Sequence, residues 1–346
     1  MAAKGQWHRD GVLVPDEKEA NTLYNKGAYG SPQPGGALVI DLAEALYLME
    51  NNRLVIHGED AGSLLRRASG AEKDFELRYI VYRDLRARSF VVKPSNLTDY
   101  NVYPRGALPG RTASSHLVRC ESERGALDAE GVVVEVARAQ KHGKLLLLGL
   151  VDEEGDLTYY EARVEALTAD APRLPAKAAR ATLLADRVLV LDANEAKALF
   201  ADGWFGRDIG IGLQLSLPEA AYLAEEKRLV VEGADGARVD PSDLVARAVR
   251  LEPDFDLRRQ LYRHLRAQGI VVKTGFKYGT HFRAYVGPPE EEHAPYLVHA
   301  VAPGRCIPWP EVAGFVRLAH GVRKRLFFAV PTAAGFSLLE LARRKP

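Results

Sequence analysis

A long internal repeat constrains the fold of this chain more than any other feature of its sequence. The stretch "DFELRYIVYRDLRARSFVVK" (74–93) returns as "DFDLRRQLYRHLRAQGIVVK" (254–273), with twelve of the twenty positions identical. Likewise "DGVLVPDEKEANTLYNKGAYG" (10–30) matches "DRVLVLDANEAKALFADGWFG" (186–206) at ten of twenty-one positions. A repeat spaced by about 175 to 180 residues is far too long for a solenoid. It indicates a duplicated pair of domains.

Each copy divides again into two parts. The first part combines short strands with helices such as "LPEAAYLAEE" (217–226), for which Ser216 is a suitable N-cap and Pro218 a suitable first-turn residue. The second part begins near "IVVK" (270–273) and alternates strands with one helix, "WPEVAGFVRLAHGVRKR" (309–325). We therefore expect an α+β / α/β fold in which each repeat has an N-terminal α+β subdomain followed by a small mixed-sheet α/β subdomain of the catalytic type. The expected limits are 1–93 and 94–166 for the first copy, 167–180 for a linker rich in Ala and Pro, and 181–272 and 273–346 for the second copy.

Composition narrows the class of protein. Of the 346 residues 47% are hydrophobic and 27% charged, a balance typical of globular domains, and we see no apolar run long enough to span a membrane. The N-terminus "MAAKGQWHRDG" lacks the apolar core of a secretory signal. Two cysteines are too few for a disulfide framework, so we expect a reducing cytoplasm. The net charge is only +1, so binding to nucleic acid would require an uneven distribution of charge.

The C-terminal copy carries an ordered set of motifs. These are GFKYG (275–279), HFRAY (281–285), HAPYLV (293–298) and VRLAHGVRK (316–324). In this order they resemble the archaeal tRNA-splicing endonuclease (tRNA-intron endonuclease). The motifs cover about the last seventy residues, and the duplicated layout resembles the class with two fused repeats that acts as a homodimer.

The resemblance implies an RNA lyase-type endoribonuclease that excises introns from precursor tRNA at bulge-helix-bulge motifs. Its products would carry a 2′,3′-cyclic phosphate and a 5′-hydroxyl. The catalytic residues implied are Tyr285, His293 and Lys324. The reaction would be metal-independent general acid-base catalysis, with no cofactor and no metal ligands.

These three residue types suit attack by a ribose 2′-hydroxyl on the adjacent phosphate. Histidine is available as an acid near neutral pH, and the lysine ammonium is a compact cation for the phosphate charge. A tyrosine with a pKa of about 10 needs a nearby cation to act as the base, and Lys324 is the candidate. Each residue also fits a purely structural role when taken alone: a strand tyrosine, a loop histidine and a lysine at a helix C-terminus.

The N-terminal copy differs at the matching positions. Aligning "DYNVY" with "HFRAY" keeps a tyrosine at Tyr103, and aligning "ASSHLVRC" with "HAPYLVHA" puts Ala113 at the position of His293. Aligning "KHGKLLLL" with "VRKRLFFA" puts Gly143 opposite Lys324. We expect a noncatalytic, structural copy that lacks both the acid and the cation.

This copy has an acidic turn that the other lacks. In the family, an acidic loop at this place inserts into a basic groove of the opposite subunit. The residues implied for this dimer clamp are Asp152, Glu153, Glu154 and Asp156. A solvated hairpin turn containing Gly155 is the alternative.

Arginines are implied as the RNA-binding residues. Arg317 matches the family arginine that stacks on a bulged base, work that suits a planar guanidinium. Its companion near the C-terminus is Arg343, with Arg344 next to it as the alternative.

Two other functions compete with cleavage of precursor tRNA. A noncatalytic RNA-binding or assembly subunit would need the three catalytic positions to be broken in both copies, and they are broken in one. A metal-dependent DNA nuclease would need carboxylates clustered on strands, whereas those of "EEEH" (290–293) and "DEEGD" (152–156) are in expected loops. Cleavage in EDTA would separate the two nucleases.

Overall fold

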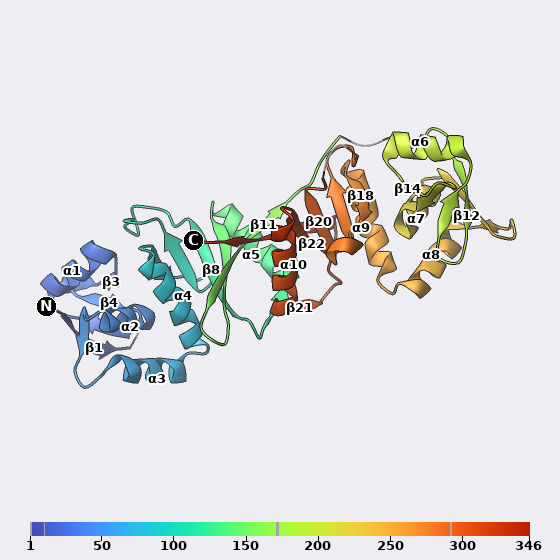
Figure 1. The fold of residues 1–346 in the computed structure, drawn as a ribbon. Coiled ribbons are helices and arrows are strands. Elements are labelled where there is room, and N and C mark those ends of the chain that lie inside the picture. The colour runs from blue at the N-terminus through green and yellow to red at the C-terminus, as the bar shows by residue number, and fades with distance from the viewer. Residues whose placement is uncertain (1, 10, 171–172, 291–292) are drawn as a thin grey trace. The chain divides into compact units, whose positions relative to one another are not determined.

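The computed structural model describes residues 2–9, 11–170, 173–290 and 293–346 (Figure 1). The chain forms two compact units, and most of each unit is one continuous segment of the chain. The first consists of Met1–Ala126, Val134–Ala162 and Arg343–Pro346, and the second of Leu127–Val133 and Arg163–Ala342. Of the linker expected over 167–180, residues 171–172 lie outside the described part, and strand β12 already begins at Ala179.

The first unit opens with a five-stranded sheet. Its strands, in spatial order, are β3 (Ser31–Pro32), β4 (Leu38–Ile40), β2 (Gly11–Val14), β1 (Ala3–His8) and β5 (Leu54–Ile56). Strands β1 and β5 are parallel, and the other neighbours are antiparallel. The associated helices are α1 (Glu17–Gly27), the 3-10 turn η1 (Pro34–Gly36), α2 (Leu42–Glu50) and α3 (Ala61–Ala71).

The second sheet of this unit is mixed. Its strands, in spatial order, are β6 (Val91–Pro94), β7 (Tyr100–Tyr103), β8 (His116–Ser122), β10 (Leu145–Val151) and β11 (Leu157–Glu165). Only β8 and β10 are parallel within this set. The remaining elements here are α4 (Phe75–Ala87), β9 (Ala126–Asp128) and α5 (Ala129–Lys141). The crossover from β8 to its parallel neighbour β10 runs through α5, as a parallel connection requires.

The second unit repeats both arrangements. Its first sheet orders β14 (Arg207–Asp208), β15 (Leu213–Leu215), β13 (Val188–Val190), β12 (Ala179–Leu183), β16 (Leu229–Gly233) and β17 (Arg238–Val239). Its helices there are α6 (Ala193–Gly203), α7 (Leu217–Glu225) and α8 (Pro241–Leu251). The mixed sheet orders β18 (Val271–Thr274), β19 (Phe282–Tyr285), β20 (Tyr296–Ala300), β22 (Arg325–Thr332) and β23 (Gly335–Arg344). The remaining elements are α9 (Phe255–Ala267), the 3-10 turn η2 (Phe276–Tyr278), β21 (Cys306–Pro308) and α10 (Trp309–Gly321).

Local sequence signals explain several helix ends. Ser216 and Glu219 form a reciprocal capping box at the start of α7, with Pro218 in its first turn, which confirms the predicted start. Helix α10 ends at Gly321, four residues before the end of the predicted segment. Arg323 there has a left-handed backbone (φ 54°), which turns the chain out of the helix and into β22.

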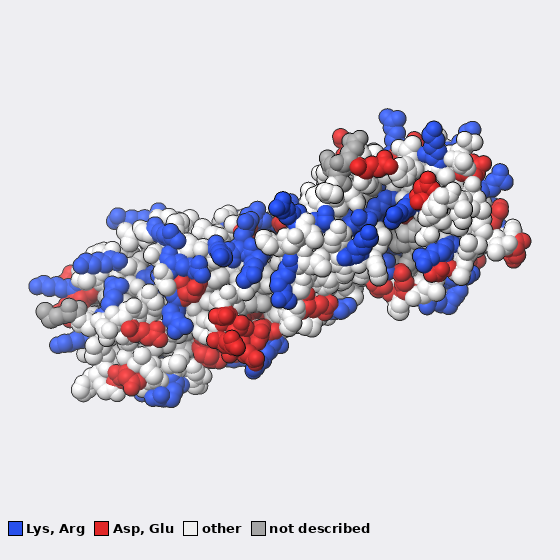
Figure 2. Space-filling model, viewed as in Figure 1, with Lys and Arg blue, Asp and Glu red and all other residues white. Residues whose placement is uncertain are grey.

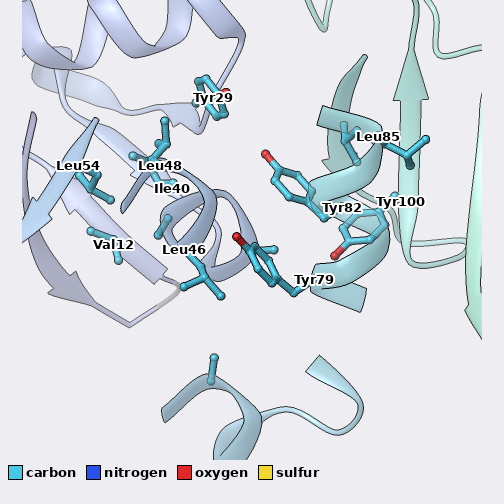
Figure 3. Packing of buried hydrophobic residues seen from close by; sticks show 14 of the residues in the cluster. Val12, Tyr29, Ile40, Leu46, Leu48, Leu54, Tyr79, Tyr82, Leu85 and Tyr100 are labelled. Atoms are coloured by element: carbon cyan, nitrogen blue, oxygen red, sulfur yellow. The ribbon is translucent and has the colours of Figure 1, made fainter. Parts of the chain in front are cut away.

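Aromatic side chains tie the mixed sheets to the helices beside them. In Figure 3, Tyr79 and Tyr82 project from α4 toward Leu46 of α2, and Tyr100 of β7 lies behind them. Tyr262 of α9 packs in the same way against Phe282 of β19, with ring centroids 6.0 Å apart. Buried aromatic rings supply much of the hydrophobic stabilisation of such a core.

The repeated lysine at the end of "VVK" has a structural cause. Lys93 Nζ lies 2.6 Å from Glu44 Oε1 and donates to the carbonyl of Gly30. Lys273 Nζ repeats this, 3.0 Å from Glu219 Oε1 and bonded to the carbonyl of Gly206. Burial would raise the pKa of Glu219, but Lys273 reverses this and the pKa is lowered. In each repeat a buried ion pair therefore joins the first strand of the mixed sheet to the first subdomain.

The predicted fold class is confirmed: an internal duplication of an α+β subdomain followed by a mixed-sheet α/β subdomain. Among the described residues, no helix is long and apolar enough to cross a membrane.

Candidate active site

A cleft in the second unit holds the first of the predicted catalytic residues. Its volume is about 1170 Å³, and Tyr285 lines it from β19. Other walls come from the α+β subdomain, including Trp204 and Glu219. Clefts of this size between subdomains are the usual place for a substrate or a partner segment.

Tyr285 is the most enclosed of the three predicted residues. It is 5% exposed and packs with Val271 and Ala294, with Trp204 at the edge of the cluster. Burial raises the pKa of the Tyr285 hydroxyl, and the nearby positive charge of Arg283 opposes that rise. Arg283 lies two residues earlier on the same strand, and its positive charge acts on Tyr285 in the direction expected of Lys324.

The other two residues adjoin the same small cluster at Ala294. His293 is exposed and directly precedes Ala294, which is buried. The ammonium of Lys324 donates a hydrogen bond to the carbonyl oxygen of Ala294. Since Ala294 also packs on Tyr285, the three predicted residues converge on one short segment.

Lys324 is positioned by the turn that follows α10. Its backbone N–H donates to the carbonyl of Ala319 at 2.9 Å, just after the left-handed residue Arg323. Its Nζ lies 5.6 Å from the centre of the Tyr278 ring, within reach of a cation–π contact. Burial, with a smaller contribution from Arg283, lowers the pKa of Lys324.

The N-terminal copy keeps more of this arrangement than its sequence indicated. The N–H of Lys144 donates to the carbonyl of Ala139, as that of Lys324 does to Ala319, and Gly143 has the left-handed backbone of Arg323. Lys144, and not Gly143, therefore stands opposite Lys324. Our alignment was one residue out of register at this turn.

The acid is the member of the triad that the N-terminal copy lacks. Leu145 pairs with His116 and Arg325 with Tyr296, so the two copies share one register here. This register leaves Ala113 at the position of His293, as predicted. Tyr103 also keeps its place, because it pairs with Val91 as Tyr285 pairs with Val271.

The arginines expected to bind RNA are all exposed. Arg317 lies on α10, and Arg343 lies at the end of β23. Arg344 is engaged by Glu161, with Nε 3.2 Å from Oε2. That ion pair favours Arg343 over Arg344 as the second stacking residue.

The acidic turn joins β10 to β11, and a group of acidic side chains lies in that region in Figure 2. Its first residue holds the turn together: Asp152 Oδ1 accepts from the N–H groups of Glu154 (3.0 Å) and Asp156 (2.8 Å). Glu153 forms an exposed ion pair with Arg124 at 3.0 Å. The side chains of Glu154 and Asp156 are exposed, so three of the four acidic residues face solvent.

Within residues 2–9, 11–170, 173–290 and 293–346, no group of three or more His, Cys, Asp or Glu side chains is placed to hold a metal ion.

Comparison with known protein families decides the relationship. Residues 75–159 and 255–336 match the model described as "tRNA intron endonuclease, catalytic C-terminal domain". Residues 3–65 and 179–245 match "tRNA intron endonuclease, N-terminal domain", and together the matches cover well over half of the chain. This chain belongs to the tRNA intron endonuclease family.

Relatives within the tRNA intron endonuclease family match over nearly their whole length. A tRNA-splicing endonuclease of Methanosarcina mazei is 39% identical, covering 99% of each chain. One of Methanococcoides burtonii is 37% identical, over 97% of this chain and 98% of its own. One of Haloferax volcanii is 34% identical over 93% of each. The duplication is thus shared by whole proteins of similar length.

Some residues of the site escaped the sequence analysis. Arg283 lies inside the HFRAY motif, but the motif alone drew attention to its tyrosine. The signal was available in the repeat, because the N-terminal copy has the neutral Asn101 at the place of Arg283. Tyr278 of GFKYG, whose ring centre lies 5.6 Å from Lys324 Nζ, was also missed.

Proposed function

We propose that this protein is an endoribonuclease that excises introns from precursor tRNA by cutting at bulge-helix-bulge motifs. The single observation that carries the proposal is the convergence of Tyr285, His293 and Lys324 around Ala294 in a domain matched by the family's catalytic model. The N-terminal copy lacks the histidine, so each chain would supply one active site.

The proposed reaction is transesterification within the RNA. Tyr285 accepts the proton of the 2′-hydroxyl, and the 2′-oxygen bonds to the adjacent phosphorus as the bond to the 5′-oxygen breaks. His293 gives a proton to the departing 5′-oxygen, while Lys324 stabilises the extra negative charge of the pentacovalent phosphate. One product end is then a 2′,3′-cyclic phosphate and the other a 5′-hydroxyl.

Metal independence is part of the proposal, since each step has a side chain to perform it. The test is cleavage of a synthetic bulge-helix-bulge RNA in excess EDTA, followed by chemical analysis of the new ends. We expect full activity and a cyclic phosphate. Loss of activity in EDTA that is restored by Mg²⁺, with 5′-phosphate ends, would contradict the mechanism and indicate a metal-dependent nuclease.

Paired cutting at the two ends of an intron requires two active sites, which a homodimer supplies. We propose that the acidic turn of one chain docks in the cleft of the other, where Arg187 and Arg207 are among the lining residues. The cytoplasm is the proposed compartment, consistent with the free thiols of Cys120 and Cys306.

A further inference from the structure

Arg283 occupies a central place that neither the motif nor the proposed mechanism uses. It lies on β19 opposite Lys273 of β18 and Leu297 of β20. Its Nε donates to the carbonyl of Thr274 at 2.8 Å, which fixes the guanidinium along the strand. Residues two apart on a strand share a face, and Cζ of Arg283 is 6.0 Å from the centre of the Tyr285 ring.

The charge of this arginine acts on two of the three proposed catalytic residues. Burial raises the pKa of Tyr285 and Arg283 opposes the rise, while Tyr278 of η2 adds to it. Burial lowers the pKa of Lys324, and Arg283 lowers it further. The same positive charge therefore opposes the effect of burial on Tyr285 and adds to the effect of burial on Lys324.

Other groups face this pair from the elements packed around it. Glu290 lines the cleft together with Tyr285 and Arg283, from the loop that follows β19. Lys273 lines it from β18, but its ammonium is held by Glu219. His293 precedes Ala294, which packs on Tyr285, and Lys324 donates to the carbonyl of Ala294. Of the described residues, Arg283 is the cation found to act on the Tyr285 hydroxyl.

The N-terminal copy shows what a neutral residue does at this position. Asn101 takes the place of Arg283, and its Oδ1 accepts hydrogen bonds from Lys144 Nζ (3.0 Å) and Ser114 Oγ (3.2 Å). Arginine has no acceptor, and its charge repels an ammonium. In the C-terminal copy, accordingly, the matching Lys324 bonds to the carbonyl beside His293 instead.

We propose that Arg283 is a positioning residue of the endonuclease, whose fixed charge favours the phenolate of Tyr285 and directs the ammonium of Lys324 toward the segment that carries His293. The inference rests on the proposed function. It adds a residue that acts through Tyr285 and Lys324 and that distinguishes the active copy from the inactive one.

The test is the pH dependence of single-turnover cleavage for Arg283→Gln and Arg283→Lys, from about pH 7 to about pH 11.5, with uncatalysed hydrolysis of the RNA measured in parallel and subtracted. For Arg283→Gln we expect the rising limb to move to higher pH, since Tyr285 is then harder to ionise. At pH values below the limb, a displacement of one pH unit slows cleavage about tenfold. The difference in rate from the wild type shrinks as the pH becomes alkaline. Arg283→Lys should keep its limb near that of the wild type, because lysine retains the charge.

Two controls separate this inference from a general loss of structure. Arg238→Gln removes an exposed arginine from β17, and its limb should not move. A purely structural role for Arg283 would lower the rate by one factor at every pH. If Arg283→Gln fails to fold, the pH dependence of cleavage is measured for Arg283→Met instead. A rising limb at the wild-type pH in the folded variant would overturn the proposal.

Failure of the proposed function has a different signature. Wild-type protein that leaves the bulged RNA intact, or Tyr285→Phe that cuts at the wild-type rate, would refute the mechanism itself. Wild-type cleavage with a slow Tyr285→Phe variant, together with an unmoved limb in Arg283→Gln, would refute only the role of Arg283.

Discussion

His293 is the residue on which the proposed chemistry depends most directly. It is exposed, whereas Tyr285 is enclosed, so its ring is accessible to the departing oxygen of a bound RNA. We predict that His293→Ala slows single-turnover cleavage by about 10² to 10⁴ and leaves RNA affinity nearly unchanged, because it removes a proton donor and little binding surface. Rapid-quench cleavage and fluorescence anisotropy with the same RNA measure the two effects.

The matched control for that variant is His142→Ala. His142 is also an exposed histidine, but it follows α5 in the copy without the acid. It should cut at the wild-type rate. Near-normal cleavage by His293→Ala would remove this histidine from the mechanism.

The exposed arginines should give a graded loss. Stacking on a base is worth about 1–3 kcal/mol by alanine substitution, so Arg317→Ala should slow cleavage of bulged RNA by about 5- to 150-fold through misplacement of the bulge. Arg343→Ala should cost more than Arg344→Ala, since Arg344 is engaged by Glu161. Cleavage measured over a range of RNA concentrations tests this, and an unchanged rate in Arg317→Ala/Arg343→Ala would exclude the stacking role.

Whether a single residue could be assigned a place from the sequence depended on the motif around it. The positions of Tyr285, His293 and Lys324 follow from motifs whose order is rare by chance. The lysine of the N-terminal copy was missed because the alignment of "KHGKLLLL" with "VRKRLFFA" set Gly143, and not Lys144, against Lys324. Backbone geometry matches Gly143 to Arg323, since both adopt the left-handed conformation of the turn. The signal was nevertheless in the sequence, because the offset of 180 residues that sets Ala113 against His293 also sets Lys144 against Lys324.

At the scale of elements, two histidines join β19, β20 and α10 in a stacked group. The rings of His281 and His299 are 4.1 Å apart, and His299 also meets Phe315 of α10 at 4.7 Å. His281 Nδ1 accepts the N–H of Ala300 at 2.9 Å, and its Nε2 lies 3.2 Å from Asp254 at the start of α9. Both contacts suit a neutral ring that accepts at one nitrogen and donates at the other.

This arrangement predicts an acid-sensitive element. Burial, with a further contribution from Arg258, lowers the pKa of His281 to about 4, although Asp254 opposes the shift. The unfolded value is about 6.5, so the stability from the neutral ring is complete above that pH and is lost as the pH falls toward 4. The loss is on the order of 2–3 kcal/mol at about 1.4 kcal/mol per unit. It should appear as a falling thermal midpoint.

The variant that tests it is His281→Asn. Asparagine can accept the same N–H without titrating, much as Asp99 accepts the N–H of Cys120 in the other copy. Thermal midpoints of the full chain from about pH 7 to about pH 4.5 should fall less steeply in this variant than in the wild type or in His57→Asn, an exposed loop control. Parallel curves for His281→Asn and the wild type would show that the pair does not govern acid stability.

Helices were predictable where the hydrophobic periodicity and the residues that cap or end a helix indicated the same limits, as in α7 and α9. The two-residue strands β3 and β14 were not, since so short a strand has no pattern of its own and exists because a neighbouring strand pairs with it. The histidine stack was also hidden, because His281 and His299 are eighteen positions apart and meet only through the pairing of β19 with β20.

At the scale of the whole molecule, the two copies differ in the residues on which the two proposed tasks, catalysis and assembly, depend. The C-terminal copy keeps His293 and Arg283, and the N-terminal copy has Ala113 and Asn101 at those places but carries the acidic turn. The buried pairs Lys93–Glu44 and Lys273–Glu219 persist in both, because they hold each sheet to its first subdomain and do not depend on catalysis.

The turn supplies the last prediction, on assembly. Exposed ion pairs contribute about 0–1 kcal/mol each, so only several carboxylates acting together in a partly buried groove could hold a dimer. We predict that Glu153→Lys/Glu154→Lys/Asp156→Lys yields folded monomers that lose coordinated cutting at the two splice sites. Light scattering measures the mass, and circular dichroism checks the fold.

Asp152 must stay in that variant, because its carboxylate accepts the N–H groups of Glu154 and Asp156 and shapes the turn. Replacing Asp152 as well would confuse loss of charge with loss of the turn. A matched control, Glu17→Lys/Glu76→Lys/Asp243→Lys, reverses three exposed acidic residues in the first turns of α1, α4 and α8, outside the acidic turn, and should remain dimeric. Since the proposed mechanism gives each chain one complete set of catalytic residues, monomers should still cut single sites slowly. An intact dimer of the turn variant would rule out the clamp, since three reversed charges in a basic groove would oppose docking where the native ones favour it.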